Sequence, residues 1–316
     1  MPTPHQMILT QIENETGHID FSIPESLSLP TVHYLLSRHL LDGGKKLRPY
    51  LCLCFGKMLG LPASQLEACA RIAEIVHSAS LAHDDVIDEA RVRRGRRTLN
   101  ASTSNAQAVL AGDLLLARST SLCLDLGNMT LARDLADTLE ELVAGEWLQL
   151  EARGNFEISE RHLERVSLAK TASLLRWCFL APLRLAGLNG EIEGLANELA
   201  RLIGLSFQMS DDCVDYSRES GKEYGKDYSE GLLNWVSWTL VAWGQKPDPS
   251  KPHGWEDSKI HEAVEDVQAR ASMKLKLARE CLEQIFLQAQ IIGLSPVRQY
   301  QQNLFDLIGT LEKRSF

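Results

Sequence analysis

Two short stretches of the chain each carry three aspartates in the spacing D-D-x-x-D. The first, "HDDVIDE", holds Asp84, Asp85 and Asp88, and the second, "SDDCVDY", holds Asp211, Asp212 and Asp215. On an α-helix the first and last aspartates of this motif share a face, about one turn apart. One copy is also typical of a solvated acidic turn, but two copies within apolar helical patterns favour a cation held by the carboxylates. Because Mg²⁺ prefers oxygen ligands and joins carboxylates to substrate phosphates, the pair predicts a magnesium site for a phosphate-bearing substrate.

Basic residues accompany the acidic motifs. Arg93 and Arg94 follow the first motif, and a second cluster, "DGGKKLRP", places Lys45, Lys46 and Arg48 after a glycine turn. Arginine donates paired hydrogen bonds to phosphate oxygens, and lysine supplies a compact positive charge. Two acidic motifs and two basic clusters therefore predict two diphosphate substrates.

The elements that must position these residues are helices. Apolar residues recur every three or four positions, which predicts helices near 31–41, 47–60, 64–90, 105–124, 129–152, 160–187, 191–218, 229–243, 257–291 and 295–312. The alternation typical of strands is not sustained in the sequence. Joints rich in Gly and Pro separate the segments, and the longest, residues 244–254, predicts a surface loop. The pattern predicts an all-α fold with residues 1–316 in a single domain.

The composition limits the classes of function. The chain has 316 residues, 44% of them hydrophobic, and a net charge of −9, which argues against a general nucleic-acid-binding role. Its seven cysteines form no C-x-x-C pair, as expected for reduced thiols. The first residues lack the pattern of a signal peptide, and no apolar run approaches the ~20 residues that cross a bilayer. We therefore expect a cytoplasmic protein without a transmembrane segment.

Six stretches together resemble one known family. They are "GGKKLRP", "EIVHSASLAHDDVIDEARVRRG", "AVLAGDLLLA", "GEWLQL", "KTASL" and "FQMSDDCVDY", in family order over roughly residues 35–231. The sequence resembles the trans-isoprenyl diphosphate synthase (polyprenyl synthetase) family, and within it the long-chain, octaprenyl-like branch. The resemblance implies an isoprenoid-synthase helical bundle with a central active-site cavity, and a homodimer.

The resemblance also implies a reaction and the residues that perform it. Family members add isopentenyl diphosphate to an allylic diphosphate in trans: Mg²⁺, commonly three ions, draws diphosphate from the allylic substrate, the isopentenyl double bond attacks the cation, and a proton is lost. The implied metal ligands are Asp84, Asp85, Asp88, Asp211, Asp212 and Asp215. The implied catalytic residues are the first five of these aspartates and Lys170. The implied allylic-diphosphate contacts are Arg93, Gln149, Lys170, Thr171, Gln208 and Lys222. The implied isopentenyl-diphosphate contacts are Gly44, Lys45, Arg48, His77 and Arg94.

Product length is expected to depend on the residues one turn before the first motif. These are Ala79 and Ser80, which are small and leave room for a growing prenyl chain along the helix. By the logic of the family, this favours products longer than farnesyl. The candidates for the end of the tunnel are Val76, Leu115, Leu116 and Trp147.

One segment departs from the family pattern. After the second motif the family usually carries a Lys and a Thr in E-G-K-x-T, but here Leu232 and Asn234 occupy those positions. Lys226 stands where an acidic residue is common, and we hypothesise that it partly replaces the missing cation. The departure keeps two alternatives open: a non-catalytic or regulatory subunit of a heteromeric prenyl synthase, and a class I terpene cyclase. The "GGKKLRP" stretch weakens the second, because a cyclase needs no isopentenyl pocket.

Overall fold

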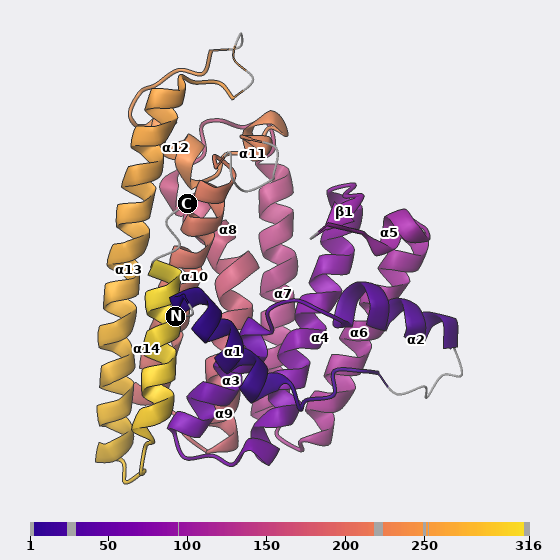
Figure 1. Cartoon of the computed structure of the whole chain (residues 1–316), viewed down its shortest axis with the longest axis vertical. Coiled ribbons are helices and arrows are strands. Elements are labelled where there is room, and N and C mark those ends of the chain that lie inside the picture. Colours follow the sequence, from indigo (N-terminus) through magenta and orange to yellow (C-terminus); the bar gives the residue numbers. More distant parts are fainter. Residues whose placement is uncertain are drawn as a thin grey trace. The chain divides into compact units, whose positions relative to one another are not determined.

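The computed structural model describes residues 3–23, 30–93, 95–217, 224–248, 251 and 253–312, and it is almost entirely helical over these ranges (Figure 1). The chain divides into two compact units: residues 1–137, 177–189 and 293–301 form unit 1, and residues 138–176, 190–292 and 302–316 form unit 2. Helices α7 (Met129–Glu151), α9 (Ser173–Leu185) and α14 (Arg298–Glu312) contribute residues to both units.

Unit 1 carries the first aspartate motif on a long helix. This helix is α4 (Ala63–Ile87). Besides α4 and the helices shared with unit 2, the elements in chain order are α1 (Pro4–Thr16), α2 (Pro30–Leu36), the π-turn η1 (Ser37–Leu41), α3 (Leu47–Met58), β1 (Val92–Arg93), β2 (Arg96–Arg97), α5 (Leu99–Ser102) and α6 (Asn105–Asp125). Helix α4 packs against α3 and α6 because its apolar stripe is buried. The two strands form a minimal hairpin that turns at Gly95, whose φ of 73° suits glycine.

Unit 2 carries the second aspartate motif. Its other elements are α8 (Glu160–Ser167), the π-turn η2 (Leu168–Ala172), α10 (Glu191–Val214), α11 (Lys226–Ser229), α12 (Trp235–Ala242) and α13 (Asp257–Ile291). Helix α10 packs along α13, and both contact α12 (Figure 1). The core between them is built from buried residues such as Leu205, Met209, Trp235 and Val267. The end of α10 with its aspartates is therefore supported by packed helices.

The all-α prediction is confirmed, and each predicted helical segment contains a helix in the described ranges. Helix α1 was not predicted, although Thr3 and Gln6 form a capping box at its start. The predicted segments 191–218 and 229–243 contain shorter helices, α10 and α12. Residues 244–248 form no helix or strand, while residues 249, 250 and 252 of the predicted loop lie outside the described residues. The single domain over residues 1–316 stays a prediction. Within the described ranges, the helices are too short or too polar to span a membrane.

Candidate active site

The glycine turn of unit 1 uses its two lysines differently. Gly43 and Gly44 both have positive φ, and the chain enters α3 with Lys46 at a φ of 47°. The Lys46 ammonium donates to the carbonyl of Leu41 at 2.6 Å and to the carboxylate of Glu74 at 2.9 Å. Lys45 is instead exposed, and Arg48 lies half-buried in the first turn of α3. Lys46 therefore fixes the turn.

The three aspartates of the first motif have different surroundings. Asp84 is half-buried, Asp88 is exposed at the end of α4, and Asp85 is buried. The Asp85 carboxylate accepts a hydrogen bond from Nε of Arg93 at 2.8 Å. Burial raises the pKa of Asp85, while the Arg93 guanidinium opposes that rise. Asp85 thus orients Arg93, whereas Asp84 and Asp88 offer the more accessible oxygens. His77, two turns before Asp84 on α4, is half-buried.

A basic cavity of 240 Å³ lies beside this motif in unit 1. Its lining includes Gly43 and Gly44 from the turn, Asp85 from α4, and Arg93 from the hairpin. Arg38 of η1 and Arg97 of β2 also line it. The structure therefore brings the glycine turn, the first motif and the arginine run together at one cavity, although the sequence suggested two separate basic pockets. Arg94 lies outside the described residues.

In unit 2, the π-turn η2 carries Lys170 and Thr171. The Lys170 ammonium lies 2.5 Å from a carboxylate oxygen of Glu146 and donates to Oε1 of Gln149 at 2.5 Å. Glycines allow the helices to approach this turn: a Cβ at Gly145 would lie 2.8 Å from Cβ of Ala169, and one at Gly204 would collide with Ala172. Sequence patterns predicted a helix here, but they did not predict that one of its turns is a π-turn with one additional residue. This turn sets the side chains of η2 between α7 and α10.

A chain of hydrogen bonds joins η2 to the second motif. The Thr171 hydroxyl donates to Oε1 of Gln208 at 2.7 Å, and Nε2 of Gln208 donates to Oδ1 of Asp212 at 2.8 Å. Oδ2 of Asp212 accepts from the main-chain N–H of Trp235 at 2.9 Å. Burial and the nearby Asp227 carboxylate raise the pKa of Asp212 well above its usual range, against the effect of these donors. Four predicted allylic-site residues, Gln149, Lys170, Thr171 and Gln208, are therefore placed beside one aspartate motif.

The other two aspartates of the second motif also differ. Asp211 is exposed, and Asp215 is buried. Oδ2 of Asp215 accepts from the main-chain N–H of Asp227 at 3.3 Å and from Nδ2 of Asn234 at 3.4 Å. The same Asn234 nitrogen donates to Oδ2 of Asp227 at 3.0 Å. The sequence did not predict that Asp227, Asn234 and Trp235 belong to the site. Asp227 is a single acidic residue outside any motif, and the contacts of Asn234 and Trp235 with the aspartates depend on how the chain folds back before α12.

The donor set suits Mg²⁺ bound together with substrate. In the described part of the chain, no three His, Cys, Asp or Glu side chains converge on a point where they would hold a metal ion by themselves. Mg²⁺ typically binds one or two carboxylates and completes its shell with phosphate oxygens and water. Asp84, Asp88 and Asp211 are accessible enough to provide such ligands.

Several predicted positions have other surroundings. Lys222 lies outside the described residues. Lys226 is 3.3 Å from Glu230, and Leu232, at the position of the family lysine, is buried with 7% of its surface exposed. Trp147, a candidate for the tunnel end, is 64% exposed, whereas Val76 and Leu115 are fully buried. Ala79 is buried in an apolar cluster with Ile75 and Leu115, and the Ser80 hydroxyl donates to the carbonyl of His77.

Comparison with known proteins finds the family that the sequence motifs resemble. Residues 30–268 match the family model described as Polyprenyl synthetase. The chain is 38% identical over 192 residues to an octaprenyl diphosphate synthase of Haemophilus influenzae, a match that spans 60% of this chain and 58% of that protein. It is 35% identical over 232 residues to an all-trans-nonaprenyl-diphosphate synthase (geranyl-diphosphate specific) of Rhodobacter capsulatus, spanning 72% of this chain and 71% of that one. Its fold is similar to the crystal structure of a decaprenyl diphosphate synthase from Rhodobacter capsulatus, with a TM-score of 0.79, 28% identity, and 99% and 96% of the two chains covered.

Proposed function

Because the chain belongs to the polyprenyl synthetase family, we propose that it is a trans-prenyltransferase that adds isopentenyl diphosphate to an allylic diphosphate. The observation that carries the proposal is the linked set of Lys170, Thr171, Gln208 and Asp212 in unit 2. This set brings a cation and two neutral hydrogen-bonding groups next to the second aspartate motif, which supports a diphosphate site there. The arginine-rich cavity beside Asp85 in unit 1 supports binding of anionic groups next to the first motif as well.

The residues have separate roles in the proposed reaction. Lys170 and Arg93 bind phosphate oxygens of the allylic substrate, and Thr171, Gln149 and Gln208 orient them; we place Lys222 in the same group. Lys45, Arg48, His77, Arg94 and the backbone at Gly44 bind isopentenyl diphosphate. Cations fixed in advance around a leaving group stabilise the charge that develops as its bond breaks. The departing diphosphate is the proposed proton acceptor, so the reaction needs no protein base.

Magnesium is the proposed cofactor, with three ions in the active site as in the family. Asp84, Asp88 and Asp211 would provide directly accessible ligands, while Asp85, Asp212 and Asp215 complete the two motifs. Bound Mg²⁺ would supply positive charge to the leaving diphosphate.

We propose a product longer than farnesyl. Ala79 and Ser80 are small, and the relatives named above are octaprenyl, nonaprenyl and decaprenyl synthases. A homodimer is also proposed. Val143, Trp147 and Leu150 share one face of α7 and are 66%, 64% and 38% exposed, which suits cover by a second copy. We also propose a cytoplasmic location, because the seven cysteines are buried and are not joined in disulfides.

The test is product analysis with the purified chain. Incubation with farnesyl diphosphate, isopentenyl diphosphate and Mg²⁺ should give longer polyprenyl diphosphates, whose dephosphorylated products are sized by mass spectrometry. Removal of the metal with a chelator should stop elongation. Absence of elongation with every allylic primer tested would reject the proposal.

One observation favours a second candidate, a non-catalytic subunit of a heteromeric synthase. Leu232 is buried at the position where the family carries a phosphate-binding lysine. Binding of allylic diphosphate without turnover by the chain alone, followed by turnover after a second subunit is added, would select this candidate.

A further inference from the structure

The segment after the second aspartate motif raises a question of charge. Asp212, Asp215 and Asp227 lie close together in unit 2, and Asp212 and Asp215 are only 5% and 6% exposed. The family position for a lysine holds Leu232, which brings no charge. Buried carboxylate oxygens are costly unless hydrogen-bond donors reach them. Neutral donors from the next few residues meet this need.

Asn234 supplies side-chain donors to two of these aspartates. Its Nδ2 lies 3.0 Å from Oδ2 of Asp227 and 3.4 Å from Oδ2 of Asp215. A side-chain amide carries two N–H donors, so one nitrogen can serve both carboxylates. The Asn234 side chain is only 4% exposed, which leaves little freedom to turn away.

The other end of the same amide begins helix α12. Oδ1 of Asn234 accepts from the main-chain N–H of Ser237 at 3.1 Å, and the Ser237 hydroxyl accepts from the main-chain N–H of Asn234 at 2.9 Å. This capping box fixes the side chain at its oxygen and so aims its nitrogen at the carboxylates.

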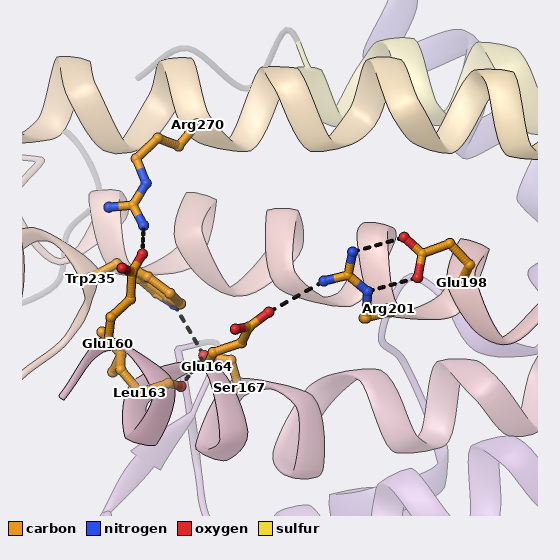
Figure 2. Close-up of polar contacts among 8 residues, drawn as sticks. All are labelled: Glu160, Leu163, Glu164, Ser167, Glu198, Arg201, Trp235 and Arg270. Carbon is orange, nitrogen blue, oxygen red and sulfur yellow. Dashed lines mark hydrogen bonds and ion pairs between the residues drawn. The ribbon is translucent and has the colours of Figure 1, made fainter.

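Trp235 extends the support to η2. Its main-chain N–H donates to Asp212, and its indole N–H donates to the Ser167 hydroxyl at 3.0 Å. Ser167 ends α8 directly before η2, and its hydroxyl donates to the carbonyl of Leu163 at 2.9 Å. Arg270 of α13 lies 5.0 Å from the Trp235 ring and pairs with Glu160 of α8 (Figure 2). The start of α12 is therefore anchored to α8 and α13.

We infer that Asn234 is a positioning residue of the second aspartate motif: its amide orients the carboxylates of Asp215 and Asp227 with neutral donors. A neutral amide orients carboxylate oxygens without cancelling their charge. The expected effect of Asn234 on catalysis rests on the proposed function, whereas its effect on the positions of the aspartates does not.

Asn234→Ser is the primary variant. Serine caps a helix about as well as asparagine and stays neutral, but its single hydroxyl cannot both cap α12 and donate to two carboxylates. Asn234→Asp is isosteric and keeps the cap oxygen, but it replaces the donor with a further carboxylate beside the three aspartates. Trp238→Phe is the matched control. It removes the indole donor to the carbonyl of Ile158, at 3.0 Å on the same helix, and Trp238 has no hydrogen bond to the aspartates among the described contacts.

Hydrogen exchange of the metal-free protein gives a readout independent of activity. We expect Asn234→Ser to speed amide exchange in the peptides covering residues 211–217 and 226–234, and Trp238→Phe to leave them unchanged. In kinetics, kcat/KM for the allylic diphosphate should fall about tenfold or more in Asn234→Ser, the effect of losing one hydrogen bond to a charged group. Asn234→Asp should lose at least as much. Trp238→Phe should stay within about twofold of the wild type, because it keeps an aromatic ring against Trp235 and removes none of the described donors to the aspartates.

Unchanged exchange and unchanged kinetics in Asn234→Ser, or wild-type kinetics in Asn234→Asp, would overturn the inference. An equal loss of kcat/KM in Trp238→Phe would reduce the role of Asn234 to helix stability and would overturn it too. If the wild-type chain does not elongate any primer, the proposed function fails, and the exchange comparison alone still decides the role of Asn234.

Discussion

Lys170 provides a sharp test of the allylic-diphosphate site, because its ammonium already has a carboxylate partner. It lies 2.5 Å from Glu146 and 2.5 Å from Gln149, and its side chain is 27% exposed. The substitution Lys170→Gln keeps most of the stem and removes the charge. If Lys170 binds the diphosphate, one charged hydrogen bond worth about 1.5–3 kcal/mol is lost, which corresponds to a fall in kcat/KM of about 10- to 100-fold. The partly exposed ion pair itself should contribute about 1 kcal/mol or less to stability.

Glu146→Gln is the matched variant. It leaves Lys170 in place but removes its competing carboxylate, so kcat/KM for the allylic diphosphate should stay within about threefold of the wild type. The double variant separates two explanations of the Lys170→Gln effect. A lysine that serves only to neutralise Glu146 would be dispensable once Glu146 is neutral, and the double variant would regain activity. A lysine that binds diphosphate leaves the double variant as impaired as Lys170→Gln.

The assay is the initial rate of elongation at varied allylic diphosphate and saturating isopentenyl diphosphate, with thermal unfolding measured on each variant. Recovery of activity in the double variant, or wild-type kinetics in Lys170→Gln, would refute the assignment of Lys170 to the diphosphate.

Three further outcomes are expected. Gly204→Ala should destabilise the protein by about 1–3 kcal/mol in urea unfolding, because its Cβ would collide with η2, whereas Gly194→Ala on the same helix meets open space and should stabilise by up to about 1 kcal/mol. The raised pKa of Asp212 means that the folded state binds its proton more tightly than the unfolded chain, so stability falls as pH rises toward the folded pKa. Asp212→Asn should thus gain stability over the metal-free wild type more at pH 8 than at pH 5, while elongation is lost. Burial raises the pKa of Cys123 and Cys281 to about 11, and all seven cysteines are buried, so a thiol reagent at pH 8 should label them only after unfolding.

Periodic apolar spacing was enough to predict most of the helices. The segment predicted near 257–291 is α13 with the same bounds, because its buried face repeats without interruption. Helix α1 was missed although it carries a capping box. The hairpin at β1 and β2 was also missed, since two residues per strand are too few for an alternation to appear.

The site was predicted as a set of residue types, but not with the differences within each set. Asp84, Asp85 and Asp88 look equivalent in the sequence, yet only Asp85 is buried and accepts from Arg93. Lys45 and Lys46 are neighbours, yet Lys46 pairs with Glu74, which lies a helix away in the sequence. Such differences depend on which side chain faces a partner from another element. The spacing of residues along one helix carries no information about that partner.

The π-turn η2 has a consequence for how this protein can change by mutation. A π-turn holds one residue more than an α-turn, so losing one codon within Leu168–Ala172 would leave a regular helix running from α8 into α9. Residues on one side of the deletion would rotate by about 100° relative to those on the other. Thr171 would then leave Gln208, although every backbone hydrogen bond of the helix could form. A deletion of one codon here can therefore remove the contacts proposed for the diphosphate in one step and still leave a folded protein on which selection can act.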